Sequence, residues 1–286
     1  MLAYEDLFVQ VYVLIDDLLS EGRVVIPIRP GPKPTCSDAE VLTINAVRHL
    51  LGRRGESTFL EEVRANWPSL FPHLPSQSEF NRRVRWLWGA TELIRQELIA
   101  SVASDPWSQV DTSALPVKHP SRHRGPEANW DGPNDLSPGF GRDAAHAEWF
   151  YGFRLAVVTD LDRHLVRRWA IVPAAVNERE VADELLDGCT PTGLLLDRGF
   201  IGREWAEQQA ELGRQIVISP GRKQRQTLPR AYLSAIAAFR NRVETTFAQI
   251  TDSLELARHG ARTFWGLLTR TAGAILAHTL LNLEYA

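Results

Sequence analysis

The spacing of apolar residues separates the chain into a helical first part and a mixed second part. Through the first hundred or so residues, apolar side chains recur at helical intervals, and Pro and Gly separate the segments without convincing period-two alternation. Ser37 and Glu40 have the spacing of a capping box, which predicts that a helix begins there. The helices predicted next are 58–66 and one from about residue 78. We therefore expect an all-α N-terminal domain at residues 1–104.

The helix predicted from about residue 78 combines an apolar face with a cluster of Arg residues. The three basic residues are Arg82, Arg83 and Arg85. Helix-turn-helix modules place such a basic, amphipathic helix in the major groove of DNA. A surface helix without a special role fits the same pattern, so both interpretations stay open. The clustering favours a DNA-binding N-terminal domain.

Beyond Pro106 the pattern changes to strands alternating with helices. The strands are predicted at 107–117, 150–159, 165–172, 193–196 and 215–219, and the helices at 178–186, 204–212, 229–257 and 263–283. The second and third strands flank a tight turn at 160–163 and should form a hairpin. This order predicts an α/β domain at residues 105–286, with a mixed sheet flanked by helices and a docked C-terminal helix.

Residues 118–146 interrupt this order. The segment is rich in Gly, Pro, Asn, Asp and His, which is the composition of an exposed loop. Loops of this length in compact domains are commonly functional. We expect it to contact a polyanion through Lys118, Arg122 and Arg124.

Composition excludes several classes of protein. Hydrophobic residues at 44% and charged residues at 23% are ordinary for a globular protein that folds in water. Acidic residues interrupt the partly apolar opening stretch, so neither a signal peptide nor a membrane span is expected there. The two cysteines, Cys36 and Cys189, lack the spacing of a disulfide framework or a zinc site. A cytoplasmic location is expected.

Charge is distributed unevenly along the chain. The net charge of −3 argues weakly against a nucleic-acid partner. The segment 214–242, however, has no Asp or Glu and seven basic residues, which are Arg214, Arg222, Lys223, Arg225, Arg230, Arg240 and Arg242. Solvated charged faces are the commoner outcome of a charge run, but they normally mix signs. The run therefore favours a surface that binds a polyanion.

Three acidic residues occupy positions suited to chemistry. Asp111 lies within the strand predicted at 107–117, where a carboxylate needs a partner because burying an isolated charge is costly. Asp197 directly follows a strand with three consecutive Leu residues, and open α/β sheets bind ligands at the carboxyl ends of strands. Glu244 follows Val243 on an amphipathic helix and can face the sheet from the margin of its apolar side.

Converging carboxylates from two strands and a helix can hold two hard divalent ions. Two ions about 4 Å apart can activate an attacking water or hydroxyl and stabilise a leaving oxygen in phosphodiester chemistry. Each acid also has a plainer interpretation: Asp111 could stabilise a turn, Asp197 could cap a loop, and Glu244 could pair with Arg240 one turn earlier. Glu178 is interpreted as an acid that stabilises a helix N-terminus, outside the site.

Four motifs together are similar to a known family. They are Val-Asp-Thr-Ser-Ala-Leu-Pro-Val at 110–117, Tyr-Gly-Phe-Arg-Leu at 151–155, Leu-Asp-Arg-Gly-Phe at 196–200 and Arg-Asn-Arg-Val-Glu-Thr-Thr-Phe at 240–247. Their combination resembles the DDE transposases of short bacterial insertion sequences. The resemblance implies a ribonuclease H-like core, Mg²⁺ or Mn²⁺, and catalytic, metal-binding roles for Asp111, Asp197 and Glu244, with Arg240 as the partner of Glu244.

The same resemblance implies cut-and-paste transposition by a homodimer assembled on double-stranded DNA, namely on terminal inverted repeats and a target. The residues expected to contact DNA are Lys118, Arg122, Arg124, Arg198, Arg222, Lys223, Arg225, Arg240 and Arg242. Family members often have a Tyr and a Lys where this chain has Ala237 and Thr251. Two alternatives stay open: a metal-dependent nuclease without strand transfer, and a non-catalytic DNA-binding protein from a decayed element.

Overall fold

The computed structural model describes residues 4–122, 130–134, 136–143, 148–189 and 191–285. The chain forms two compact units. One comprises Met1–Val102 together with Gln249–Ala286, and the other comprises Ala103–Ala248. No described helix is both long enough and apolar enough to cross a membrane.

Every regular element of the first unit, among the residues that the structure describes, is a helix. Its helices are α1 (Tyr4–Ser20), α2 (Asp38–Leu50), α3 (Glu56–Asn66), α4 (Gln77–Trp86), α5 (Trp88–Ala100) and α10 (Phe264–Asn282), with the short turns η4 (Gln249–Ser253) and η5 (Leu256–Arg258) before α10. The predicted capping box is present: the Ser37 hydroxyl accepts from the Glu40 amide at 3.1 Å, and the Glu40 carboxylate accepts from the Ser37 amide. It fixes the start of α2.

The C-terminal helix α10 belongs to this first unit, which differs from the predicted boundary at residue 104 followed by one domain to residue 286. Leu276 and Leu280 of α10 join the same apolar cluster as Phe8 of α1 and Ile44 of α2. Small residues on α10 allow this close approach, since a Cβ at Gly273 would lie 2.6 Å from the His49 ring. No local sequence pattern could predict this boundary, because these contacts join segments that are over 200 residues apart in the sequence.

One of the three Arg residues of helix α4 is buried, whereas a recognition helix would present all three to DNA. Arg83 is 2% exposed and donates to the carbonyl oxygen of Cys36 at 2.7 Å and to the carboxylate of Asp38 at 2.6 Å. It therefore ties α4 to the start of α2. Arg82 and Arg85 remain exposed.

The second unit is built on a six-stranded mixed sheet. Its strands are β1 (Trp107–Lys118), β2 (Gly139–Asp143), β3 (Glu148–Asp160), β4 (Val166–Pro173), β5 (Gly193–Leu196) and β6 (Gln215–Ile218). The order is β2-β3-β1-β5-β6, and β4 also pairs with β3. Strand β3 is antiparallel to β1, β2 and β4, whereas β1, β5 and β6 run parallel. The predicted hairpin is thus β3–β4.

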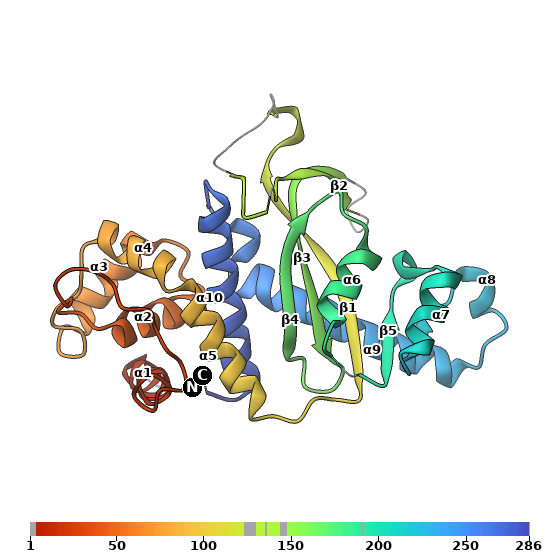
Figure 1. The fold of residues 1–286 in the computed structure, drawn as a ribbon, viewed down its shortest axis with the longest axis horizontal. Helices are drawn as coiled ribbons and strands as arrows, with labels where there is room; N and C mark the ends of the chain where they lie inside the picture. Colours follow the sequence, from red (N-terminus) through yellow and green to blue (C-terminus); the bar gives the residue numbers. More distant parts are fainter. Residues whose placement is uncertain (1–3, 123–129, 135, 144–147, 190, 286) are drawn as a thin grey trace. The chain divides into compact units, whose positions relative to one another are not determined.

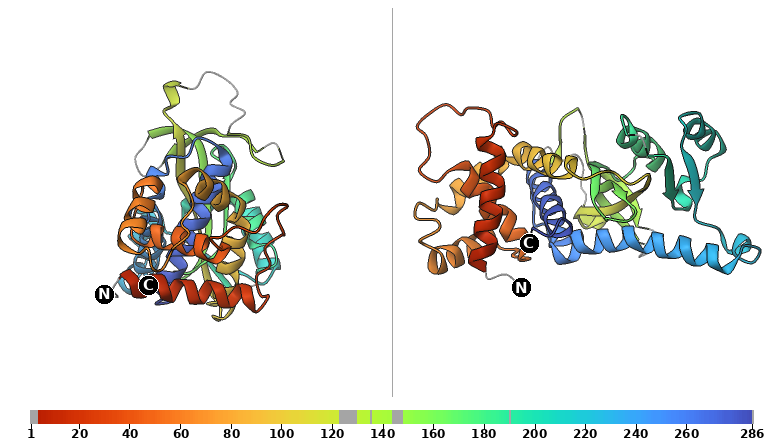
Figure 2. Two further views of the ribbon diagram at one scale, coloured as in Figure 1. Left: turned by 90° about the vertical axis from the view of Figure 1, so that its left-hand side faces the viewer. Right: turned by 90° about the horizontal axis from the view of Figure 1, so that it is seen from below.

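Helices cover both faces of this sheet, as predicted. They are α6 (Glu178–Leu186), α7 (Arg203–Glu211), the short α8 (Arg222–Arg225) and α9 (Arg230–Ala248), with the 3₁₀ turns η1 (Pro120–Arg122) and η3 (Arg198–Phe200). Alternate residues of a strand point to opposite faces. Leu194 and Leu196 accordingly pack with α6, whereas Leu195 packs with Ile236 of α9. Figure 2 shows α9 as one long helix running along the sheet.

Two predicted segments need correction. Residues 118–146 were expected to form a loop, but β2 lies within them and pairs with residues 148–152 of β3. Its sequence, Gly-Phe-Gly-Arg-Asp, has little strand propensity, and it forms because small residues fit a crowded edge: a Cβ at Gly141 would lie 2.8 Å from the Cβ of Ala174. The helix predicted to end at residue 257 stops at Ala248, and Glu255 beyond it has a left-handed backbone.

Candidate functional site

The sheet brings Asp111 and Asp197 side by side. Strands β1 and β5 pair in parallel register, with Gln109 opposite Leu195. The same register continued by two residues brings Asp111 level with Asp197, at the point where β5 ends. Two of the three acids predicted from the sequence therefore lie level with each other, Asp197 just after the carboxyl end of β5 and Asp111 within the longer strand β1.

Local hydrogen bonds orient both carboxylates. Asp197 caps the 3₁₀ turn that follows β5, and its Oδ1 accepts from the Gly199 amide at 2.7 Å. Oδ1 of Asp111 accepts from the amide of Thr112 at 2.8 Å. Each Asp therefore stabilises a turn or loop, as the plainer interpretation of the sequence proposed. The second carboxylate oxygen of each has no hydrogen-bond partner among the described residues, so it is available to a ligand.

Asp111 is an unusually basic carboxylate. Burial is the main cause that raises its pKa to about 7, and the negative charges of Asp197 and Glu178 raise it further. The Thr112 amide and the Arg240 guanidinium oppose this rise in pKa without cancelling it. Without a neutralising cation, the two like charges beside Asp111 disfavour its ionised form.

This raised pKa has a measurable consequence for stability. Between the ordinary value of 3.8 and about 7, folded Asp111 keeps a proton that the unfolded chain has released. Its contribution to the free energy of unfolding is therefore complete below the ordinary value and is lost as pH rises through about 7, with a slope of at most ~1.4 kcal/mol per pH unit. Denaturant unfolding in EDTA at several pH values should show this slope in the wild type and not in Asp111→Asn. Parallel profiles for the two proteins would contradict the assignment.

Glu178 joins the two Asp residues, although the sequence placed it outside the site. Its Oε1 accepts from the Thr112 hydroxyl at 2.8 Å and from Nη1 of Arg154 at 2.6 Å. A Cβ at Gly199 would lie 2.5 Å from Glu178 Oε2 and 3.0 Å from Asp197 Oδ1, so both carboxylates adjoin the same glycine. The sequence feature that could have indicated the role of Glu178 is Arg154 in the Tyr-Gly-Phe-Arg-Leu motif, because a basic residue that faces the site needs an acidic partner.

Glu244 lies apart from this group. Its side chain is 58% exposed and pairs with Arg240 at 3.4 Å, as the plainer interpretation of the sequence proposed. Among the described residues, no three His, Cys, Asp or Glu side chains lie close enough to hold a metal ion.

The helix that carries Glu244 nevertheless faces Asp111. Gln109, on the same side of β1 as Asp111, donates to the Phe239 carbonyl of α9 at 2.9 Å. The charge of Arg240, the next residue, lowers the pKa of Asp111. Glu244 follows Arg240 by one helical turn on the same side of α9.

The residues expected to contact DNA are not equally available. Arg198, Arg222, Lys223 and Arg225 are exposed. Arg242 instead donates to the carboxylate of Asp162 at 2.6 Å and to the Leu161 carbonyl, which fastens α9 to the turn between β3 and β4. Lys118 lies 5.8 Å from the centroid of the Tyr151 ring. The side chain of Arg122 and all of Arg124 lie outside the described residues.

The donor set suits a hard divalent cation. Mg²⁺ and Mn²⁺ prefer carboxylate oxygen over nitrogen and sulfur. A cation between Asp111 and Asp197 would remove the repulsion that raises the pKa of Asp111. The residues present therefore fit such an ion.

Comparisons with known proteins identify a family for this chain. The family model for the transposase DDE domain matches residues 110–280, which is more than half of the 286 residues. No curated protein matches the chain. A solved structure, the cryo-electron microscopy structure of a piggyBac transposase synaptic complex with hairpin DNA, is 10% identical with a TM-score of 0.39. The match covers 81% of this chain and 54% of that chain, so this chain spans about half of its length.

Proposed function

Because the chain belongs to the transposase DDE domain family, a family of enzymes that act on DNA, we propose that it cuts DNA at the ends of a mobile element and joins them to a target. The observation that carries this proposal is the parallel register of β1 and β5, which brings Asp111 of β1 level with Asp197 just after the end of β5. Glu244 completes the catalytic set in this proposal. We assign the second unit a ribonuclease H-like core, which its mixed sheet with helices on both faces supports.

Asp111, Asp197 and Glu244 would hold Mg²⁺ or Mn²⁺, with two ions as the proposed number. When bound, such ions supply the activation of a water or a DNA 3′-hydroxyl and the stabilisation of the leaving oxygen. The Thr112 and Gly199 amides hold the two Asp carboxylates in place. Because Asp111 is partly buried, its charge acts in a medium of lower dielectric than water.

Release of Glu244 from Arg240 is part of this proposal. Their exposed ion pair at 3.4 Å contributes little to stability, so exchanging it for a cation costs little. Freed in this way, Arg240 would be available to a DNA phosphate, as would the exposed Arg198, Arg222, Lys223 and Arg225. The guanidinium is suited to a phosphate because it can donate two parallel hydrogen bonds.

The substrate proposed is double-stranded DNA with terminal inverted repeats, bound by a homodimer in the cytoplasm of a bacterium. Exposed basic residues around β5, α8 and α9 support a polyanionic partner. The raised pKa of Asp111 supports a metal-dependent reaction over a purely DNA-binding role, because burying repelling carboxylates costs stability and has no use in a binding module.

A strand-transfer assay tests this function. Purified protein is incubated with labelled linear DNA that carries the element ends, a supercoiled target plasmid and Mg²⁺ or Mn²⁺. We expect labelled DNA joined covalently to the plasmid. Nicked or cut ends without joined product would show that the protein is a nuclease without strand transfer. DNA that is bound but not cut would show that it is a DNA-binding protein without catalysis.

A further inference from the structure

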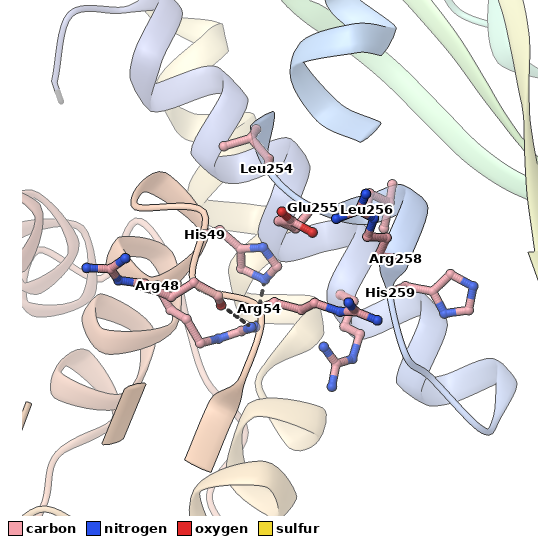
Figure 3. A pocket seen from close by; sticks show the side chains of 10 residues that line it. Arg48, His49, Arg54, Leu254, Glu255, Leu256, Arg258 and His259 are labelled. Atoms are coloured by element: carbon pink, nitrogen blue, oxygen red, sulfur yellow. Dashed lines mark hydrogen bonds between the residues drawn. The ribbon is translucent and has the colours of Figure 1, made fainter. Parts of the chain in front are cut away.

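A cavity in the first unit gathers more positive charge than its surroundings neutralise. It has a volume of about 150 Å³ and is lined by α2, the start of α3, α4, α10 and the segment before α10. Its charged lining residues are Arg48, Arg85, Arg262, Arg270 and Glu56. We call it the Arg48 cavity. A smaller pocket, drawn in Figure 3, also uses Arg48 and Arg270 and brings in His49 and Leu254.

Arg48 is the deepest of these cations. It is 3% exposed, and its Nη atoms donate to the Arg53 carbonyl at 3.2 Å and to Oδ1 of Asn45 at 3.1 Å. Its Nε has no partner among the described residues. A buried charged donor without an acceptor is costly, so the positive charge of Arg48 at the wall of the cavity is incompletely compensated.

His49 does not supply the missing negative charge. Because a guanidinium can only donate, the contact of 2.9 Å between Arg48 Nη2 and His49 Nε2 requires that this ring nitrogen accepts. Burial, followed by the charges of Arg48 and Arg270, holds the pKa of His49 well below its usual range. The ring is thus neutral, and its role is to bind the Leu254 backbone and hold the turn seen in Figure 3.

The cavity has one carboxylate for four guanidinium groups among its described lining residues. Glu56 already accepts from the side-chain amides of Gln77 at 2.7 Å and Asn81 at 3.2 Å. Within the described part of the chain, none of the four Arg residues forms an ion pair. Burial and the charge of Arg270 lower the pKa of Arg48 to about 10, and burial with the charges of Arg85 and Arg54 lowers the pKa of Arg270. The charge of Glu56 opposes both shifts without cancelling them.

We propose that the Arg48 cavity binds an oxyanion of the phosphate class. Arg48 and Arg270 form its inner wall, whereas Arg85 and Arg262 are exposed at its rim, so the anion has access from solvent. Guanidinium groups match phosphate oxygens with paired hydrogen bonds, and an anion would compensate the positive charge of the four Arg residues that line the cavity. The volume is several times the ~30 Å³ that one water occupies in the liquid, which leaves room for such a group.

Two sources present this chemistry: a free phosphate and a phosphodiester of a DNA backbone. Only binding of a DNA phosphodiester rests on the proposed function. In that case the cavity would contact DNA at a place separate from the catalytic acids. Tests on full-length protein therefore need two arms, one with inorganic phosphate and one with duplex DNA.

The phosphate arm measures thermal unfolding in phosphate and in chloride at equal ionic strength. We expect phosphate to raise the Tm of the wild type, because a ligand that binds only the folded state stabilises it. Arg85→Gln and Arg270→Gln should lose this shift, while Arg64→Gln, an exposed Arg on α3 outside the cavity, should keep it. Asp197→Asn should also keep it, so the result does not depend on catalysis.

The DNA arm measures duplex affinity by fluorescence anisotropy. If the cavity takes a backbone phosphate, the affinity should fall about tenfold in Arg85→Gln and Arg270→Gln but not in Arg64→Gln, and inorganic phosphate should compete. Unchanged affinity together with the phosphate-specific Tm shift would assign the cavity to free phosphate. Equal responses of all variants in both arms would overturn the proposal. Arg85→Gln changes an exposed side chain, so it decides the test even if Arg270→Gln does not fold.

Discussion

Asp197→Asn is expected to lower DNA cleavage and joining by about 10³-fold or more while leaving DNA binding nearly unchanged. The substitution removes a negatively charged oxygen at constant shape, and metal stabilisation of the reacting oxygens accounts for several kcal/mol of such barriers. The amide side chain can still accept from the Gly199 amide, so the turn after β5 should keep its form. Cleavage rates and anisotropy on the same DNA ends measure the two quantities.

Asp187→Asn is the matched control, because it makes the same chemical change at an exposed position of the same unit. It should cut and join DNA at the wild-type rate. Cleavage by Asp197→Asn at more than about a tenth of the control rate would exclude Asp197 as a metal ligand. Equal losses of cleavage and DNA binding would instead indicate a folding defect.

Glu244→Gln is expected to abolish the reaction as completely as Asp197→Asn, with little change in stability. Glu244 is exposed and its only described partner is Arg240, so the folded protein depends little on its charge. The loss would then come from the chemistry alone. Glu211→Gln, at an exposed position on α7, is the control for a change of Glu to Gln.

Glu178→Gln distinguishes the two candidates for the third acid. Glu178 holds Thr112 and Arg154 through partly buried hydrogen bonds, so its loss should lower the free energy of unfolding by about 1–3 kcal/mol. The folded fraction should retain much of its cleavage activity. If Glu178→Gln abolishes cleavage and Glu244→Gln does not, the third acid is Glu178.

Local patterns were sufficient for most elements of the second unit. The three consecutive Leu residues before Asp197 predicted β5, and the turn at 160–163 predicted the β3–β4 hairpin. These signals are local because burial on both faces and tight turns each require particular residues at adjacent positions. Strand β2 was missed because its pairing depends on the edge of β3 and on Gly139 and Gly141, not on its own propensity.

The candidate site was predictable where it depends on strand ends and unpredictable where it depends on long-range pairing. Asp197 follows from the rule that open α/β sheets bind ligands at the carboxyl ends of strands, and Asp111 from the need of a carboxylate within a strand for a partner. Glu178 was set aside because its partners Thr112 and Arg154 are 66 and 24 residues away in sequence. Likewise, no local pattern shows that α10 packs with α2, which creates the Arg48 cavity.

Anomalous scattering from crystals grown with Mn²⁺ is the sharpest test of the proposed metal site, because it locates the ions without reference to activity. We expect an anomalous peak bonded to carboxylate oxygens of both Asp111 and Asp197, with Glu244 turned from Arg240 to become the third ligand. Absence of any peak at these two Asp residues, in crystals that hold Mn²⁺ elsewhere, would contradict the proposed site.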